Sequence, residues 1–213
     1  MSLFEAVIFD LDGVIVSTDN YHFLAWGRMC EEEGIKFNSE INHRLRGVSR
    51  MESLNIILEN TEKQYSNLEK EQLAKRKNDY YRNSLSSLSD DDLLPGVRSV
   101  LDYLKNKGVR VAIGSSSKNT PMILKQVKLN NYFDAVSDGN DIVNSKPDPE
   151  VFLLAAKKLG IEPEKCLVIE DAMAGVEAAH RGRMKVAAIG DAANSSQADY
   201  ILGELEDLKK VIN

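Results

Sequence analysis

The sequence predicts an α/β fold, in which a doubly wound, Rossmann-like parallel-sheet core domain carries an inserted all-α helical cap domain. Short apolar runs alternate with amphipathic helical patterns beyond residue 83, and such alternation is typical of a parallel sheet covered by helices on both faces. Residues 17–82 show helical patterns alone. We therefore expect residues 1–16 and 83–213 to form the core and residues 17–82 to form the cap.

The first element and the cap follow from local patterns. Ala6–Phe9 is a continuous apolar run, which predicts a strand buried on both faces. After this strand, apolar residues recur at helical spacing as far as Gly34, which predicts a first helix. Ser49 with Glu52 fits a capping box at the start of a second helix. The charge-rich stretch 68–88 predicts a third helix.

The remaining elements alternate along the core. Strands are predicted where apolar runs are short, and helices where apolar residues recur every three or four positions. The predicted strands are 109–113, 166–169, 186–189 and 200–202, and the predicted helices are 97–107, 121–127, 152–159, 172–181 and 205–211.

Composition excludes several classes of function. The net charge is −6 and the pI is about 5.2, which disfavours sequence-independent nucleic-acid binding because that binding needs a basic stripe. No apolar run is long enough for a membrane helix, and the N-terminus does not resemble a signal peptide. Cys30 and Cys166 lie in apolar patterns typical of buried free thiols. We expect a cytoplasmic monomer that binds small molecules, and neither nucleic acid nor membrane.

Polar side chains cluster where the predicted strands end. Asp10 and Asp12 follow the first strand, residues 114–119 follow the second, and Glu170 and Asp171 follow the strand at 166–169. Lys146 precedes the helix at 152–159. Ligands of open parallel sheets bind beyond the carboxyl ends of the strands, so these four clusters are expected to meet in one site.

The residue types suit a magnesium site. Mg²⁺ prefers one or two carboxylates together with water and phosphate oxygens. Asp10 and Asp171 can supply the carboxylates, with Glu170 as an auxiliary and the backbone carbonyl of Asp12 as a further candidate.

The same clusters suit phosphoryl transfer. Asp10 can attack phosphorus as a nucleophile, and Asp12, two residues on, can act as general acid and base. Ser115 can hold a phosphoryl oxygen, and Lys146 can neutralise charge on the transferring group.

Each cluster also has an ordinary structural explanation. A lone Asp-x-Asp is usually a turn, Gly-Ser-Ser-Ser is usually a loop, Glu170-Asp171 could begin a helix and Lys146 could be a surface lysine. The occurrence of all four at predicted strand ends favours the functional interpretation.

These four segments resemble the motifs of the haloacid dehalogenase superfamily. They are Phe9-Asp10-Leu11-Asp12-Gly13-Val14-Ile15, the strand ending in Ser115, Lys146-Pro147-Asp148-Pro149 and Ile169-Glu170-Asp171-Ala172. The resemblance implies a cap inserted after the first motif, Asp10 as nucleophile, Asp12 as general acid and base, Mg²⁺ as cofactor and phosphate esters as substrates. The two-aspartate first motif indicates a phosphatase or a mutase.

The cap is similar to that of the branch of this superfamily that interconverts β-D-glucose 1-phosphate and glucose 6-phosphate. The resemblance lies in residues 18–26, 47–50, 75–79 and 117–119. It implies that Thr18 is part of a hinge, that His22 positions or deprotonates a sugar hydroxyl together with Asp12, and that Arg50 grips the phosphate that is not transferred. It further assigns substrate contacts to Trp26, Gly47, Ser53, Lys77, Ser116, Ser117 and Asn119.

Alternatives remain open at this level. Packing alone could explain His22 and Trp26, and Lys77 could belong to a solvated face. A sugar-phosphate phosphatase with the same nucleophile is the second candidate function, and a non-catalytic phosphosugar-binding protein is the third. His43 and His180 receive no role.

Overall fold

A six-stranded parallel sheet forms the centre of the molecule. The structure is a computed structural model that describes residues 3–59, 61–194 and 196–212. Its strand order is β3-β2-β1-β4-β5-β6, and every neighbouring pair is parallel. The strands are β1 (Ala6–Phe9), β2 (Arg110–Gly114), β3 (Ala135–Ser137), β4 (Cys166–Glu170), β5 (Lys185–Ala188) and β6 (Tyr200–Ile201).

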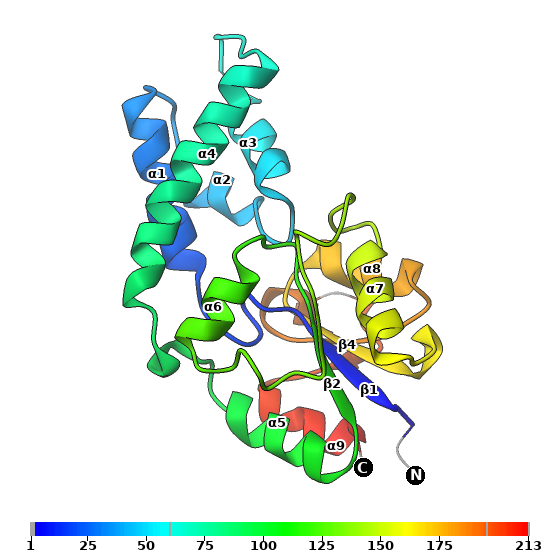
Figure 1. Cartoon of the computed structure of the whole chain (residues 1–213). Helices are drawn as coiled ribbons and strands as arrows, with labels where there is room; N and C mark the ends of the chain where they lie inside the picture. The colour runs from blue at the N-terminus through cyan, green and yellow to red at the C-terminus, as the bar shows by residue number, and fades with distance from the viewer. Residues whose placement is uncertain (1–2, 60, 195, 213) are drawn as a thin grey trace.

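Helices cover both faces of this sheet (Figure 1). Helices α5 (Val97–Asn106), α6 (Thr120–Gln126) and α9 (Leu208–Ile212) share a hydrophobic cluster with one set of strand side chains, which includes Phe9. Helices α7 (Glu150–Leu159) and α8 (Met173–Arg181) share a second cluster with the opposite set, which includes Ile8. Alternate residues of each strand thus enter opposite layers. The predicted doubly wound core is confirmed.

Four helices stand beyond the carboxyl ends of the strands (Figure 1). They are α1 (Asp19–Glu32), α2 (Ser39–His43), α3 (Arg50–Leu58) and α4 (Asn67–Ser84). They bury a separate hydrophobic cluster that contains Trp26, Met29, Leu54, Ile57 and Leu73. A separate core is what a small helical domain needs, and the boundaries at residues 17 and 82 stay a prediction.

Several local details differ from the expected elements. Ser49 accepts a hydrogen bond from the Glu52 amide, whereas a complete capping box lies at Ser66 and Glu69, where α4 begins. The strand β3 was not predicted, because it is only three residues long. The helix expected over 68–88 ends earlier and continues as a 3₁₀ turn. The 3₁₀ helices are η1 (Leu85–Ser87), η2 (Asp90–Asp92), η3 (Pro163–Lys165), η4 (Gly190–Asn194) and η5 (Leu205–Asp207).

None of the helices in the described part of the chain combines the length and the apolar character that a membrane crossing would require.

Candidate active site

A cavity of about 540 Å³ lies between the strand ends and the helices α1, α3 and α4. Most residues predicted for the site line it, and the exceptions are Thr18 and Glu170, which are fully buried. The predicted residues that line the cavity are Asp10, Asp12, His22, Trp26, Gly47, Arg50, Ser53, Lys77, Ser115, Ser116, Ser117, Asn119, Lys146 and Asp171. Residues from distant parts of the chain are thus brought together as expected, although their roles remain predictions.

Three carboxylates form the acidic centre of the cavity. Asp10, Glu170 and Asp171 each place a carboxylate oxygen within 4.8 Å of the other two. Burial, followed by the charges of Glu170 and Asp10, raises the pKa of Asp171 to about 9. Gly13 leaves room for this group, because a Cβ at Gly13 would lie 2.0 Å from Asp171 Oδ2. Such a crowded set of hard oxygen donors fits Mg²⁺. The Asp12 carboxylate lies outside the set, and the use of its backbone carbonyl as a ligand stays a prediction.

Lys146 is the cation of this centre. Its ammonium group lies 2.5 Å from Asp10 Oδ1 and 2.6 Å from Glu170 Oε1, and its side chain is only 1% exposed. Although burial alone would lower it, the two carboxylates raise the pKa of Lys146 above its usual value. The second oxygen of Glu170 accepts a hydrogen bond from the Ala172 amide. Lys146 therefore stays charged beside Asp10, and the surface-lysine alternative is wrong.

Asp12 lies beside the acidic centre and is bound by Thr18. The Thr18 hydroxyl donates a hydrogen bond to Asp12 Oδ1. Burial and then the charge of Asp10 raise the pKa of Asp12 to about 7, although the bond from Thr18 opposes the shift. A carboxyl with a pKa near neutrality can both give and take a proton, as a general acid and base must.

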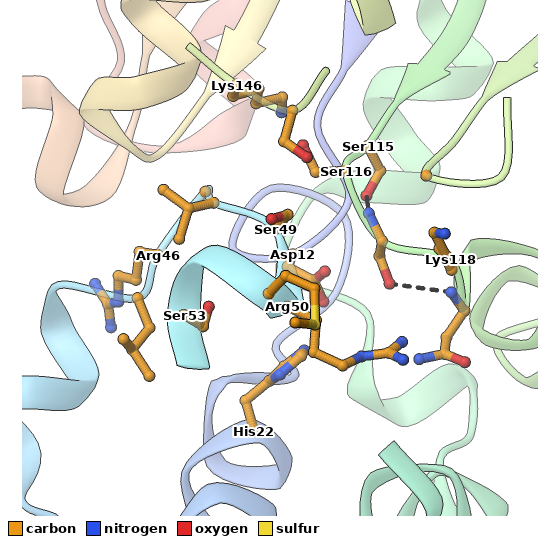
Figure 2. A pocket seen from close by; sticks show the side chains of 18 of the residues that line it. Asp12, His22, Arg46, Ser49, Arg50, Ser53, Ser115, Ser116, Lys118 and Lys146 are labelled. Carbon is orange, nitrogen blue, oxygen red and sulfur yellow. Dashed lines mark hydrogen bonds between the residues drawn. The ribbon is translucent and has the colours of Figure 1, made fainter. Parts of the chain in front are cut away.

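The loop after β2 is ordered by its own serines. Ser115 Oγ accepts from the Ser117 amide at 3.1 Å, and Ser117 Oγ accepts from the Asn119 amide at 3.2 Å (Figure 2). Asn119 also donates to Asn78 of α4 at 2.9 Å. These bonds fix the loop against the cap and leave the Ser116 hydroxyl buried without a partner among the described residues.

His22 and Lys77 form a basic pair on the cap side. Lys77 Nζ lies 2.7 Å from His22 Nδ1, and it sits 4.8 Å from the Trp26 ring centroid and 4.7 Å from that of Tyr81. Burial, followed by neighbouring cations, lowers the pKa of both groups well below the usual range. Lys77 is 2% exposed, so the alternative of a solvated face is wrong.

Arg50 and Lys118 make the far end of the cavity electropositive. Arg50 extends from α3 toward the side of the cavity that carries Ser115 and Lys118, whereas Arg46 points to the opposite side (Figure 2). Within the described ranges neither Arg50 nor Lys118 has an ion-pair partner, and burial lowers the pKa of Arg50. Lys118 was not predicted as a site residue, although it lies between the predicted residues Ser117 and Asn119.

The loop between α2 and α3 connects the cap to the core. Arg46 pairs with Asp19 and with Asp191 of η4, and His43 Nε2 lies 3.1 Å from the same Asp191 carboxylate. Gly47 has a φ of +75°, and a Cβ there would lie 3.1 Å from the Cβ of Ala172 in the core. Close approach at Gly47 therefore requires glycine.

Known proteins share this architecture. Residues 7–189 match the model of a family described as haloacid dehalogenase-like hydrolase. The chain is 42% identical to a β-phosphoglucomutase of Bacillus subtilis (strain 168) over 206 residues, which cover 96% of this chain and 91% of that protein. It is 36% identical to a phosphorylated carbohydrates phosphatase of Thermotoga maritima, over 82% of this chain and 80% of that protein.

A solved structure has the same fold. The crystal structure of β-phosphoglucomutase from Clostridium difficile superposes with a TM-score of 0.92 at 36% identity. The match covers 99% of this chain and 97% of that chain.

Proposed function

This chain belongs to the haloacid dehalogenase-like hydrolase family, and from that premise we propose that it interconverts β-D-glucose 1-phosphate and glucose 6-phosphate. It is an enzyme, a phosphomutase or a phosphatase. Support for the mutase comes from the 42% identity to a β-phosphoglucomutase over 96% of the chain. A sugar phosphate as substrate suits both kinds of relative.

The transfer begins at Asp10. A carboxylate oxygen of Asp10 forms a bond to phosphorus while the bond from phosphorus to the sugar oxygen breaks, which gives an aspartyl phosphate. Asp12, with a pKa raised to about 7, gives its proton to the departing oxygen. Lys146, 2.5 Å from Asp10, offsets the charge that gathers there.

Asp10 and Asp171 would hold Mg²⁺ directly. Glu170 is engaged by Lys146 and the Ala172 amide, so it serves as the auxiliary acid. Bound Mg²⁺ would neutralise negative charge on the carboxylates and on the phosphoryl oxygens.

The second half of the reaction needs a second anion site. Arg50 and Lys118 line the cavity and form no ion pair within the described ranges, and a planar guanidinium is well suited to bidentate phosphate binding. A bisphosphorylated sugar that turns between this end and Asp10 can present either phosphate for transfer. His22 and Lys77 line the same cavity and would orient the sugar hydroxyl beside Asp12.

The single observation that carries the proposal is one cavity lined by two separate sets of groups that suit a phosphate. One set is the Asp10, Ser115 and Lys146 centre, and the other is the Arg50 and Lys118 pair. The cap would exclude water, which otherwise hydrolyses the aspartyl phosphate.

A sugar-phosphate phosphatase is the second candidate. The 36% identity to the Thermotoga maritima phosphatase supports it. The two functions differ only in whether a sugar hydroxyl or water attacks the aspartyl phosphate, and the fold is common to both.

One assay separates the candidates. We expect purified protein with Mg²⁺ and a glucose bisphosphate primer to isomerise β-glucose 1-phosphate faster than it releases inorganic phosphate. Phosphate release without isomerisation would contradict the mutase proposal and favour the phosphatase. Asp10→Asn should abolish both activities. Turnover that this substitution leaves unchanged would show that the activity does not come from this site, and would favour a non-catalytic phosphosugar-binding role for it.

A further inference from the structure

We propose that Asn140 is a positioning residue, which holds the backbone of Lys118 so that the Lys118 side chain meets the phosphate that is not transferred. This inference rests on the proposed function, because it uses the role given there to Lys118. It goes further by assigning a task to the turn after β3 (residues 138–141), which belongs to none of the motifs found in the sequence.

The turn after β3 packs directly against the loop after β2. The Ser115 amide donates to the Ser137 carbonyl at 3.1 Å, and the Gly139 amide donates to the Ser117 carbonyl at 3.3 Å. A Cβ at Gly139 would lie only 2.3 Å from the carbonyl oxygen of Ser116, so this close approach of two backbones requires glycine. The turn is therefore in a position to fix the loop that lines the cavity.

Asn140 adds a side-chain hydrogen bond to Lys118. Asn140 Nδ2 donates to the Lys118 carbonyl oxygen at 3.0 Å and to Asp138 Oδ1 at 2.9 Å. The Asn140 backbone amide donates to the same Asp138 oxygen at 2.7 Å. An amide nitrogen carries two protons, so both side-chain bonds can form together. Asp138 is buried and Asn140 is exposed, so a substitution at Asn140 removes the contact without opening a cavity in the core.

The turn has its own attachment to the core. The Asp138 amide donates to Asp141 Oδ2 at 3.0 Å, and the same oxygen accepts from Lys158 Nζ of α7 at 2.8 Å. Lys158 Nζ also donates to the Val136 carbonyl of β3 at 2.6 Å. The turn is thus tied to a helix and a strand of the core independently of the loop after β2, and it can serve as a fixed support for Lys118.

Lys118 is a side chain that needs such a support. It lines the cavity, and a lysine has a long flexible stem whose direction depends on how its backbone is held. A Cβ at Gly139 would lie 3.0 Å from Lys118 Cγ, so the turn also leaves room for the first part of that stem. Loss of the Asn140 bond should therefore weaken the grip of Lys118 on a phosphate and leave the chemistry at Asp10 intact.

The number of phosphates on the substrate distinguishes a positioning role from a structural one. β-Glucose 1,6-bisphosphate presents one phosphate to Asp10 and the other to the Arg50 and Lys118 pair. Acetyl phosphate has one phosphate, which Asp10 takes as acetate leaves, so it does not use the Arg50 and Lys118 pair. A displaced Lys118 should therefore weaken binding of the bisphosphate and spare acetyl phosphate, whereas general damage to the fold would affect both.

The test measures how first-turnover rates of the full-length enzyme with Mg²⁺ depend on substrate concentration. For Asn140→Ala we expect the half-saturating concentration of β-glucose 1,6-bisphosphate to rise about fivefold, which is the loss expected from one hydrogen bond. Its maximal rate, and both parameters for acetyl phosphate, should change less than about twofold, because the lost contact contributes to binding alone. An equal rise with both substrates, a change in maximal rates alone, or no change would overturn the proposal.

Two further variants complete the design. Asn144→Ala is the matched control, because Asn144 lies in the same segment between β3 and α7 but its side-chain amide donates to Glu150 at 3.1 Å. It should leave all these parameters unchanged. Lys118→Met with Asn140→Ala should bind the bisphosphate as well as Lys118→Met alone, since Asn140 acts through Lys118. Additive losses of affinity would contradict the proposal.

Failure of the proposed mutase function would look different. Wild-type protein that releases acetate from acetyl phosphate but does not act on the bisphosphate would refute the sugar assignment. Asn140 is then tested by hydrogen exchange at the Asn119 amide, which shares a peptide group with the Lys118 carbonyl and donates to Ser117 Oγ at 3.2 Å. Asn140→Ala should speed this exchange about fivefold, and Asn144→Ala should not. Unchanged exchange in Asn140→Ala would overturn the positioning role whatever the substrate.

Discussion

His22 is a buried base whose environment opposes protonation. Burial lowers its pKa, and the adjacent Lys77 and Arg50 cations lower it further. In the unfolded chain the same imidazole titrates near its ordinary value of 6.5. Below that pH the unfolded state binds a proton at this imidazole and the native state does not. The free energy of unfolding must therefore fall as the pH falls.

We predict that His22→Gln reduces this acid sensitivity. The wild-type free energy of unfolding should lose up to about 1.4 kcal/mol per pH unit more than that of the variant between about pH 6.5 and 4.5. Urea unfolding at a series of pH values measures the difference. His43→Gln, at a side chain that is 67% exposed, is the control and should keep the wild-type slope. Equal slopes in wild type and His22→Gln would contradict the assignment.

Lys146 compensates two buried carboxylates, and a third lies beside them. We predict that Lys146→Met destabilises the metal-free protein by about 3–5 kcal/mol, because it leaves buried charge unpaired. Mg²⁺ would replace part of the missing positive charge. The rise in Tm on adding Mg²⁺ should therefore be larger in the variant than in wild type.

Lys118→Met is the control for the Lys146 prediction. Lys118 lines the same cavity but makes no ion pair among the described residues. Its Mg²⁺-dependent rise in Tm should match that of wild type. If Lys146→Met also showed the wild-type rise, the view of Lys146 as the compensating cation would be wrong.

At the level of elements, α4 is the long cap helix and has the complete capping box. Ser66 Oγ accepts from the Glu69 amide, while Glu69 Oε2 accepts from the Ser66 amide at 2.8 Å. Ser49 at the start of α3 makes only the first of these two kinds of bond. We predict that Ser66→Ala lowers the free energy of unfolding by about 1 kcal/mol.

Ser49→Ala is the matched comparison and should cost less in urea unfolding, because Ser66→Ala also removes the bond that the Ser66 hydroxyl donates to Glu69 Oε2 at 2.7 Å. An equal or larger loss for Ser49→Ala would show that this bond from hydroxyl to carboxylate adds nothing to the stability of α4.

Some elements of the fold are easier to predict from the sequence than others. Core strands such as Ala6–Phe9 are continuous apolar runs, and their ends carry Asp10 and Glu170, so periodicity placed both the sheet and its acidic centre. The strand Ala135–Ser137 could not be predicted, because three residues are too few to show a periodic pattern. Its position in the sheet is set by pairing with β2.

The cap residues were harder to interpret. Lys77 stands in a run of charged residues typical of a solvated surface, and only tertiary packing between Trp26 and Tyr81 shows that it is buried. Tyr81 matches no motif, and its ring contact with His22 depends on tertiary packing that local patterns cannot reveal.

At the level of the whole molecule, Asp191 of the core joins Arg46 and His43 of the cap. These side chains are between 33% and 67% exposed, so their attraction is modest and is screened by salt. We predict that Asp191→Asn lets the cap open more often and admits water. The ratio of phosphate release to isomerisation should rise about two- to fivefold, as expected for loss of a surface pair of this kind.

Asp199→Asn is the matched control for Asp191→Asn. Asp199 pairs with Lys185 and His180 within the core, so its loss should leave the ratio unchanged. Added NaCl should raise the ratio in wild type toward that of Asp191→Asn. A ratio that Asp191→Asn does not change would show that this contact does not govern closure.

The position of β1 in the sheet has a consequence for synthesis of the chain. β1 is translated first, yet its partners are β2 and β4, in which Arg110 and Cys166 pair with Ala6. In the nascent chain, β1 therefore stays unpaired until β2, which begins at Arg110, has been made. Long-range pairing of this kind is slow and leaves aggregation-prone intermediates. We therefore expect the cap to fold before the sheet closes around β1, and we expect chaperones to assist that closure.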